Sequence, residues 1–313
     1  MNTYKIITIS EGAAGMRSQI EGLASLISES YRNFDLKIKS IFKNLPIELM
    51  PTSSFIYQNL SSLKIEKNTI LISCGKKSVK ASIYLKKKYK DKIFNIHIQN
   101  PKINHNYFDL IVCPEHDNLN FDNCVSTLLA IHNIKFKRNI RMKNTLNFII
   151  GGPNKYFKFH RDTQEKILSE IKFLSNKFKV NVIPSRRTPK ELIKGLSKID
   201  NENIITFDDL FNPSKYGELL SQGSLQVVTW DSISMISEAI SSEAGTFLFK
   251  FEEKLCPKRY HNFFNKIIDL NLAQFYYQNL KPYEISINEY NKNLKTKILN
   301  KIQSNLRFNF GNA

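Results

Sequence analysis

An alternation of short β-branched runs with amphipathic stretches most constrains the fold of this chain. The run at residues 5–10 precedes a stretch in which Ile20, Leu23 and Ile27 recur at helical spacing. Strands that alternate with helices form parallel sheets, because each crossover returns the chain to the same end of the sheet. Further strands are predicted at residues 34–41, 68–75, 93–99 and 108–114. The first part of the chain is therefore predicted to form a Rossmann-like α/β unit.

A second series of the same kind begins after a basic segment at residues 133–145 that has neither periodicity. It predicts strands at residues 146–150, 180–184, 203–207, 224–230 and 246–251, with helices between them. We therefore predict two Rossmann-like domains with parallel sheets, residues 1–140 and 141–284, and one or two terminal helices over 285–313. Two such domains in tandem are expected to leave a cleft, which loops at the carboxyl ends of the strands would face.

The charge and the cysteine content of the sequence place only broad limits on its function. The net charge of +18 over 313 residues suits an anionic partner. Lysines are nevertheless spread through many segments, as an AT-rich genome would produce, so a purely compositional origin stays open. The four cysteines form no CxxC pair, no signal peptide is recognisable, and no apolar run approaches the ~20 residues of a membrane span. We expect a cytoplasmic protein whose membrane contact, if any, is peripheral.

The stretch VVTWDSISMISEA carries the strongest ligand-binding pattern in the sequence. A strand ends near Trp230, and Asp231, Ser232 and Ser234 crowd the following helix start, where N-cap oxygens and exposed amides suit phosphate. Glu238, one turn into the helix, could accept hydrogen bonds from ribose hydroxyls. The alternative is an ordinary helix capped by Asp231, with Glu238 solvated.

Two more loops follow strands at the same predicted edge of the second sheet. One contains Gly151 and Gly152, and the other runs from Ser185 through two arginines to Thr188. Adjacent arginines at a strand end can bind phosphate through bidentate hydrogen bonds. Alternatively, the glycines form a turn and the arginines are solvated.

The first domain offers weaker candidates. Gly12 and Gly15 lie between a strand and a helix, where free amides can hold an anion, although the spacing is not G-x-G-x-x-G and the turn needs no ligand. His116 and Asp117 follow the strand ending near residue 113, and a histidine beside a carboxylate can act as a general base. The remaining histidines fall in no metal-ligand spacing, so no metal site is predicted.

Together these stretches resemble the Elm-type mitochondrial fission family and its bacterial relatives, which belong with glycosyltransferases of the GT-B fold. The resemblance runs in order from residue 4 to about 266. It rests on SEGAAGMRSQIEGLA, FDLIVCPEHD, IIGGPNKYFKF, PSRRTP, TWDSISMISEA and KRYHNFF. It implies a GT-B-like pair of domains, a nucleotide-sugar site in the second domain, and a C-terminal helix that returns to the first.

Carried over by position, the resemblance implies two sets of residues. The donor-binding set is Gly151, Gly152, Ser185, Arg186, Arg187, Thr188, Asp231, Ser232, Ser234, Met235, Ser237 and Glu238. The acceptor side is lined by Gly12, Gly15, Gln19, His116 and Asp117. Related glycosyltransferases often place a histidine directly after the first glycine-rich loop, where this chain has Met16. The catalytic base would then be Glu11 or His116.

Our leading hypothesis is metal-independent transfer of a sugar from a nucleoside-diphosphate donor, with no cofactor, to an acceptor whose identity is open. A lipid-linked acceptor would suit the basic surface around residues 86–92, which could rest on anionic lipid. The alternative is a noncatalytic scaffold that recruits a protein partner at a membrane surface. Specific nucleic-acid binding is not expected, because no stripe of alternating aromatic and basic residues is present.

Overall fold

The computed structural model describes residues 4–137, 139–207 and 213–310, and its chain divides into two units. Unit 1 comprises residues 1–133 and 288–313, and unit 2 comprises residues 134–287. The change of unit falls before the expected residue 140. Residues ahead of the second sheet already pack on unit 2, where the Lys137 amide donates to the Ser221 hydroxyl at 2.9 Å.

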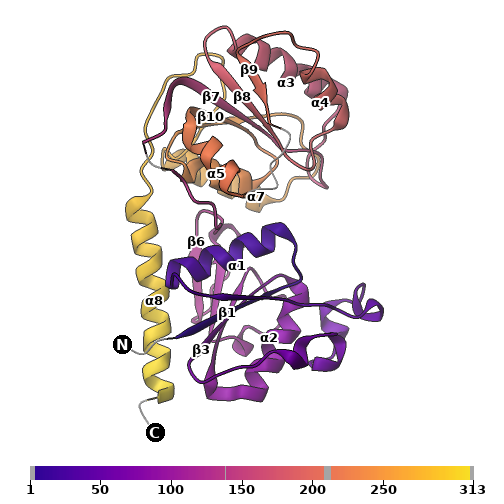
Figure 1. Cartoon of the computed structure of the whole chain (residues 1–313), viewed down its shortest axis with the longest axis vertical. Helices are drawn as coiled ribbons and strands as arrows, with labels where there is room; N and C mark the ends of the chain where they lie inside the picture. Colours follow the sequence, from indigo (N-terminus) through magenta and orange to yellow (C-terminus); the bar gives the residue numbers. More distant parts are fainter. Residues whose placement is uncertain (1–3, 138, 208–212, 311–313) are drawn as a thin grey trace. The chain divides into compact units, whose positions relative to one another are not determined.

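Unit 1 is built on a parallel sheet of six strands in the order β2-β1-β3-β4-β5-β6 (Figure 1). The strands are β1 (Lys5–Ser10), β2 (Arg32–Asp35), β3 (Thr69–Cys74), β4 (Ile93–Ile98), β5 (Leu110–Pro114) and β6 (Cys124–Thr127). Every residue of β3 and β4 is buried, as expected for a parallel sheet covered on both faces.

Two helical layers cover this sheet. On one face, α1 (Ala14–Ile27) packs with the C-terminal helix α8 (Asn288–Phe310), whose Leu294, Ile298 and Ile302 are buried in a shared core. On the other face lie α2 (Lys76–Tyr89) and the connection between β2 and β3. Figure 1 shows α8 in yellow alongside α1, although the two helices lie at opposite ends of the sequence.

Unit 2 contains a parallel sheet in the order β12-β11-β10-β7-β8-β9, the strand order of a doubly wound nucleotide-binding fold. Its strands are β7 (Met142–Ile150), β8 (Lys179–Pro184), β9 (Ile204–Thr206), β10 (Gly223–Thr229), β11 (Gly245–Phe249) and β12 (Gln274–Phe275). Its helices are α3 (Arg161–Leu174), α4 (Lys190–Leu196), α5 (Pro213–Gln222), α6 (Ile233–Ser241) and α7 (Lys258–Asp269). Helices α3 and α4 share one buried core against the sheet.

The strand expected at residues 34–41 is wrong beyond its first two residues. β2 ends at Asp35, and the chain continues through the short 3-10 helices η1 (Ser40–Phe42), η2 (Ile47–Leu49), η3 (Ser54–Ile56) and η4 (Leu60–Ser62). The alternation in the sequence is real, because Leu36 and Ile38 are buried while Lys37 between them is exposed. However, Ile38 makes only an isolated bridge with Tyr57, so the segment lacks the partner strand that a ladder requires.

No helix in the described part of the chain is long and apolar enough to cross a membrane.

Candidate functional site

The three loops singled out in the second half of the sequence meet at one edge of the unit 2 sheet. They follow β7, β8 and β10, which are neighbours in the sheet and run parallel. From β7 the chain moves outward through β8 and β9, then crosses back to β10 on the other side of β7. This reversal makes the carboxyl ends of β7 and β10 the switch point, where open α/β sheets bind their ligands.

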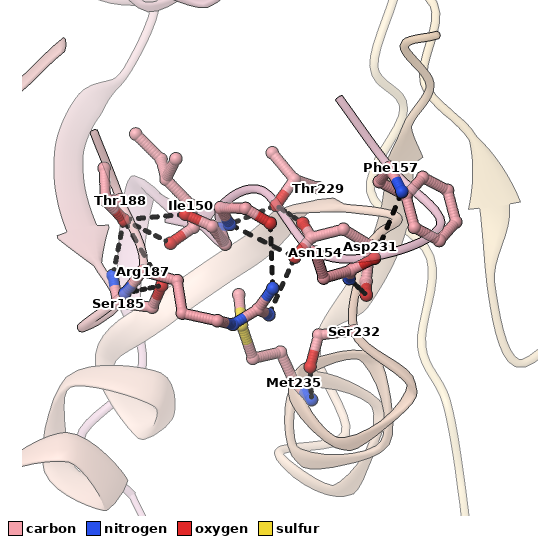
Figure 2. A network of polar contacts seen from close by, with 12 residues as sticks. Ile150, Asn154, Phe157, Ser185, Arg187, Thr188, Thr229, Asp231, Ser232 and Met235 are labelled. Atoms are coloured by element: carbon pink, nitrogen blue, oxygen red, sulfur yellow. Dashed lines mark hydrogen bonds and ion pairs between the residues drawn. The ribbon is translucent and has the colours of Figure 1, made fainter. Parts of the chain in front are cut away.

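Asp231 is the centre of the polar network that joins these loops (Figure 2). Its buried carboxylate accepts hydrogen bonds from the Gly152 amide at 3.1 Å and the Thr229 hydroxyl at 2.8 Å. It also forms a 2.8 Å ion pair with Arg187, and its carbonyl accepts from the Asn154 side chain at 3.1 Å. Burial raises the pKa of Asp231, while Arg187, Thr229 and Gly152 act in the opposite direction.

The loop after β8 is shaped by its own polar side chains. Arg187 donates through Nη1 to the Gly152 carbonyl at 2.8 Å, in addition to its ion pair. The Thr188 hydroxyl donates to the Ile150 carbonyl at 2.9 Å and accepts from the Ser185 amide at 2.8 Å. Arg187 and Thr188 therefore hold the loops together, and Arg187 is not a freely solvated arginine.

Gly151 and Gly152 are needed because other groups approach their backbone closely. A Cβ at Gly151 would lie 2.1 Å from an Asp231 carboxylate oxygen, and one at Gly152 would lie 1.9 Å from the Arg187 carbonyl oxygen. Both glycines have ordinary negative φ values, so close approach and not backbone conformation requires them.

Asp231 does not cap helix α6, although the alternative interpretation of an ordinary capped helix requires it. Ser232 is the N-cap, and its hydroxyl accepts from the Met235 amide at 3.4 Å. The Ser237 hydroxyl donates to the Ile233 carbonyl within the helix at 2.8 Å. Among the described residues, the amides of Ile233 and Ser234 have no hydrogen-bond acceptor, and the Ser234 side chain is exposed. These amides are the unsatisfied donors expected at a helix N-terminus.

Arg186, in the loop after β8, is available to bind an anionic ligand at this edge of the unit 2 sheet. Its side chain is exposed, and it pairs with no carboxylate in the part of the chain that the structure describes. A phosphate near the start of α6 could therefore be met by backbone amides and by one arginine that the network does not use.

The alternative interpretation of the sequence, in which Glu238 is solvated, is wrong. Glu238 accepts a hydrogen bond from the Tyr216 hydroxyl of α5 at 3.1 Å. Burial raises the pKa of Glu238 to about 7, with the Tyr216 hydrogen bond acting in the opposite direction. Sequence reasoning missed Tyr216, because it lies 22 residues away on a helix without a recognisable motif.

The candidate residues of unit 1 are held by separate contacts. Glu11, after β1, pairs with Lys77 at the start of α2 at 2.7 Å. Gln19 accepts a hydrogen bond from the Gln99 side chain at 3.0 Å. Met16 fills the space beside Gly75, where an added Cβ would lie 2.3 Å from the Met16 sulfur.

Gly12 and Gly15 differ in backbone conformation. Gly12 has a φ of +84°, which favours glycine, whereas Gly15 lies in the first turn of α1. Nothing lies within 4 Å of a Cβ built at either position. The space around both glycines is therefore open.

The two candidate bases lie apart in the unit 1 sheet. His116 sits in η7 (Glu115–Asp117) after β5, with its Nε2 4.0 Å from an Asp117 carboxylate oxygen and only 9% of its side chain exposed. Glu11 follows β1, and β3 and β4 separate β1 from β5. Three strand spacings of about 4.8 Å place the two strand ends about 14 Å apart. The structure does not bring Glu11 and His116 into one catalytic pair.

One cluster of possible metal ligands was not anticipated. The ligand atoms of Glu253, Cys256 and His261 lie within 4.8 Å of one another, near the start of α7. The His261 Nε2 and a Glu253 carboxylate oxygen are 3.4 Å apart, so an ion pair accounts for their contact. Their spacing in the sequence matches no metal-binding motif, so the sequence does not predict this cluster.

Comparisons with known proteins place the chain in a family. A family model described as "Mitochondrial fission ELM1" matches residues 14–297. The uncharacterized protein RP120 of Rickettsia prowazekii is 25% identical over 89% of this chain and 92% of that protein. The mitochondrial fission protein ELM1 of Arabidopsis thaliana is 24% identical over 59% of this chain, which spans about half (52%) of that protein.

Two solved structures share the fold over almost the whole length of the chain. The glycotransferase of kitacinnamycin aligns with a TM-score of 0.52 at 9% identity, covering 99% of this chain and 95% of that chain. A structure provisionally named a UDP-N-acetylglucosamine 2-epimerase, from Listeria monocytogenes, aligns with a TM-score of 0.52 at 11% identity, covering 96% and 88%. The fold is GT-B-like, as predicted, and it is shared by glycosyltransferases and UDP-sugar epimerases.

Proposed function

The chain belongs to the mitochondrial fission ELM1 family, and on that premise we propose that unit 2 binds a nucleoside-diphosphate sugar as the donor for metal-independent glycosyl transfer. The observation that carries the proposal is the meeting of three polar loops at the switch point between β7 and β10. The Asp231–Arg187 network would hold the loops in a fixed shape before any ligand arrives. Such preorganisation is what a site for a charged ligand needs.

The diphosphate and the ribose of the donor would each meet a group of matching chemistry. The diphosphate would accept hydrogen bonds from the amides of Ile233 and Ser234 and pair with Arg186. The ribose hydroxyls would donate to Glu238, which Tyr216 positions. The helix dipole and the arginine would also stabilise the leaving diphosphate, so the transfer needs no metal ion.

A second candidate function is nucleotide-sugar binding without transfer, by a protein that recruits a partner. The contacts of unit 1 favour it, because Met16 occupies the expected histidine position and Glu11 is already paired with Lys77. A transferase would have to use His116 with Asp117, or release Glu11 from its ion pair, to deprotonate an acceptor.

The test is calorimetric titration of the full chain with UDP-, GDP- and ADP-sugars and with the corresponding nucleosides. Arg186→Met should weaken diphosphate binding about tenfold and leave nucleoside binding unchanged, as expected for one lost charge-assisted contact. Glu238→Gln should weaken ribonucleotide binding several-fold and have little effect on 2′,3′-dideoxy analogues. Arg161→Met, at an exposed arginine on α3, is the matched control for lost charge.

Absence of binding for every ligand would refute the donor site. If ligands bind but the chain neither hydrolyses nor transfers the sugar over a panel of acceptors, binding without transfer is the better description. Equal losses in Arg186→Met and Arg161→Met would mean that general charge, and not the start of α6, attracts the ligand.

A further inference from the structure

The connection between β2 and β3 in unit 1 has two contrasting sides. One set of its apolar residues, which includes Ile47, Met50 and Ile56, is buried in the core beneath α2. Another set points outward, and we call Ile41, Leu45, Leu49 and Phe55 the outer apolar patch. Ile41 is 76%, Leu49 71% and Phe55 65% exposed.

Exposed apolar side chains are ordinary when they are scattered, but these are concentrated. Four of the nine large exposed hydrophobic residues in the described chain fall within residues 41–55. The Phe42 and Phe55 rings meet edge to face with their centroids 6.0 Å apart, which brings η1 and η3 together. This contact places Phe55 beside η1, the element that carries Ile41.

Lysines flank the patch in the sequence, and one of them lies against it in the structure. Residues 36–64 contain four lysines (Lys37, Lys39, Lys43 and Lys64) and one carboxylate (Glu48), a net charge of 4 − 1 = +3. The Lys39 ammonium lies 3.9 Å from the centroid of the Phe55 ring, so cation and apolar surface adjoin. The neighbouring helix α2 carries six lysines and no carboxylate, and its Lys87 and Lys88 are exposed.

We propose that the outer apolar patch inserts into the headgroup region of an anionic lipid bilayer, with the flanking lysines bound to lipid phosphates. Aliphatic and phenylalanine side chains bordered by lysine are the composition of interfacial membrane anchors. Protein interfaces are enriched in tyrosine, tryptophan, phenylalanine, methionine and arginine and depleted of lysine. Residues 36–64 contain four lysines, no tryptophan and no arginine, and their Met50 and Tyr57 are buried. The inference concerns unit 1 and does not depend on nucleotide binding.

The surface around residues 86–92 is a less suitable centre for lipid contact than the sequence indicates. Lys86 pairs with Asp109 at 2.7 Å and donates to the Ile93 carbonyl at 2.7 Å, so it is held in the fold. Its exposed neighbours Lys87 and Lys88 add charge, but no exposed apolar residue accompanies them within α2.

Vesicle flotation of the full chain tests the proposal. Vesicles of phosphatidylcholine with 30 mol% phosphatidylglycerol should bind the protein at least tenfold more strongly than phosphatidylcholine alone, and salt should weaken the binding. The chain has a single tryptophan, the buried Trp230, so Phe55→Trp adds an exposed reporter. Its emission should shift to the blue when anionic vesicles are added.

Paired variants separate insertion from general charge. Ile41→Ser with Phe55→Ser should lower the affinity for anionic vesicles at least tenfold and change the melting temperature only slightly, because both side chains are mostly exposed. Lys39→Glu with Lys43→Glu should have a similar effect at low salt. The matched control is Leu255→Ser with Tyr277→Ser, two large hydrophobic residues of unit 2 that are 95% and 73% exposed, and this variant should bind like the parent chain.

Three results would overturn the proposal. The first is that the protein binds neither type of vesicle. The second is binding without a shift in the Phe55→Trp emission, which would mean adsorption by charge alone. The third is that the Ile41→Ser, Phe55→Ser variant changes the sedimentation coefficient but not vesicle binding, which would assign the patch to a contact with a second copy of the chain.

Discussion

The loops after β7, β8 and β10 in unit 2 share one partly buried ion pair, whereas the loops after β1 and β3 in unit 1 are joined by the more exposed pair of Glu11 and Lys77. In unit 2, Asp231 reaches the first two loops through Gly152 and Arg187. In unit 1, Glu11 contacts Lys77 and His116 contacts Asp117, with no residue common to the two pairs. The same kind of sheet edge is thus built in two ways.

This difference has a physical consequence for function. Buried polar networks fix geometry, because each lost contact leaves another group unsatisfied in a low-dielectric interior. Ion pairs that are partly exposed, such as Glu11 with Lys77, contribute little and can exchange with water or ligand. We expect the unit 2 edge to be formed before ligand binding and the unit 1 edge to adapt when an acceptor or partner binds.

The largest expected effect comes from breaking the ion pair on its exposed side. The Asp231 side chain is 0% exposed and that of Arg187 is 39% exposed. Arg187→Met would leave a buried carboxylate without its cation and should lower the free energy of unfolding by about 3–5 kcal/mol in urea titrations at pH 8. Part of this loss should be recovered as the pH is lowered, because burial raises the pKa of Asp231 and protonation removes the buried charge.

The control for this experiment is Arg186→Met, because Arg186 is exposed and unpaired within the described chain. We expect its free energy of unfolding to stay within about 0.5 kcal/mol of the parent. Equal effects of the two substitutions would contradict a structural role for Arg187.

Glu238 should make stability depend on pH. Its pKa is about 7 in the fold against 4.5 for an unperturbed glutamate, so between these values the folded state holds a proton that the unfolded chain has lost. The free energy of unfolding should therefore fall as pH rises from 4.5 to 7, by up to about 3 kcal/mol, and the contribution should be constant above that range.

Urea titrations across this pH range measure the slope. Glu238→Gln should flatten it, while Glu165→Gln, at an exposed glutamate on α3, should keep it. An unchanged slope in Glu238→Gln would show that the carboxylate is already ionised at pH 5.

A pair of glycine substitutions gives the smallest effects and the most direct comparison. Gly152→Ala meets the Arg187 backbone and should cost about 1–3 kcal/mol, since neither backbone can move without breaking the network. Gly15→Ala has open space in a helix and should stabilise the chain by about 0.5–1 kcal/mol. Thermal unfolding should show opposite shifts, and shifts of the same sign would contradict the contrast between the two edges.

Much of the fold could be predicted because its causes are local. The buried runs of β3, β4 and β8 need only β-branched residues with turn signals at their ends, and the sequence shows both. The position of the three unit 2 loops at one edge then follows from parallel pairing. Residues 36–63 escaped prediction, because alternation reports which side chains are buried and not whether a neighbouring strand is present.

The sequence by itself determined most of the succession of strands and helices and the loops that carry polar chemistry, and its resemblance to a known family indicated the GT-B-like architecture. Tertiary structure alone decided how those polar groups are used. In the fold, Arg187 pairs with Asp231 while Arg186 is exposed, and Tyr216 donates a hydrogen bond to Glu238. The four side chains of the outer apolar patch are exposed to solvent. The physical reason is that periodicity depends on neighbours along the chain, whereas ion pairing, desolvation and exposure depend on residues that only folding brings together.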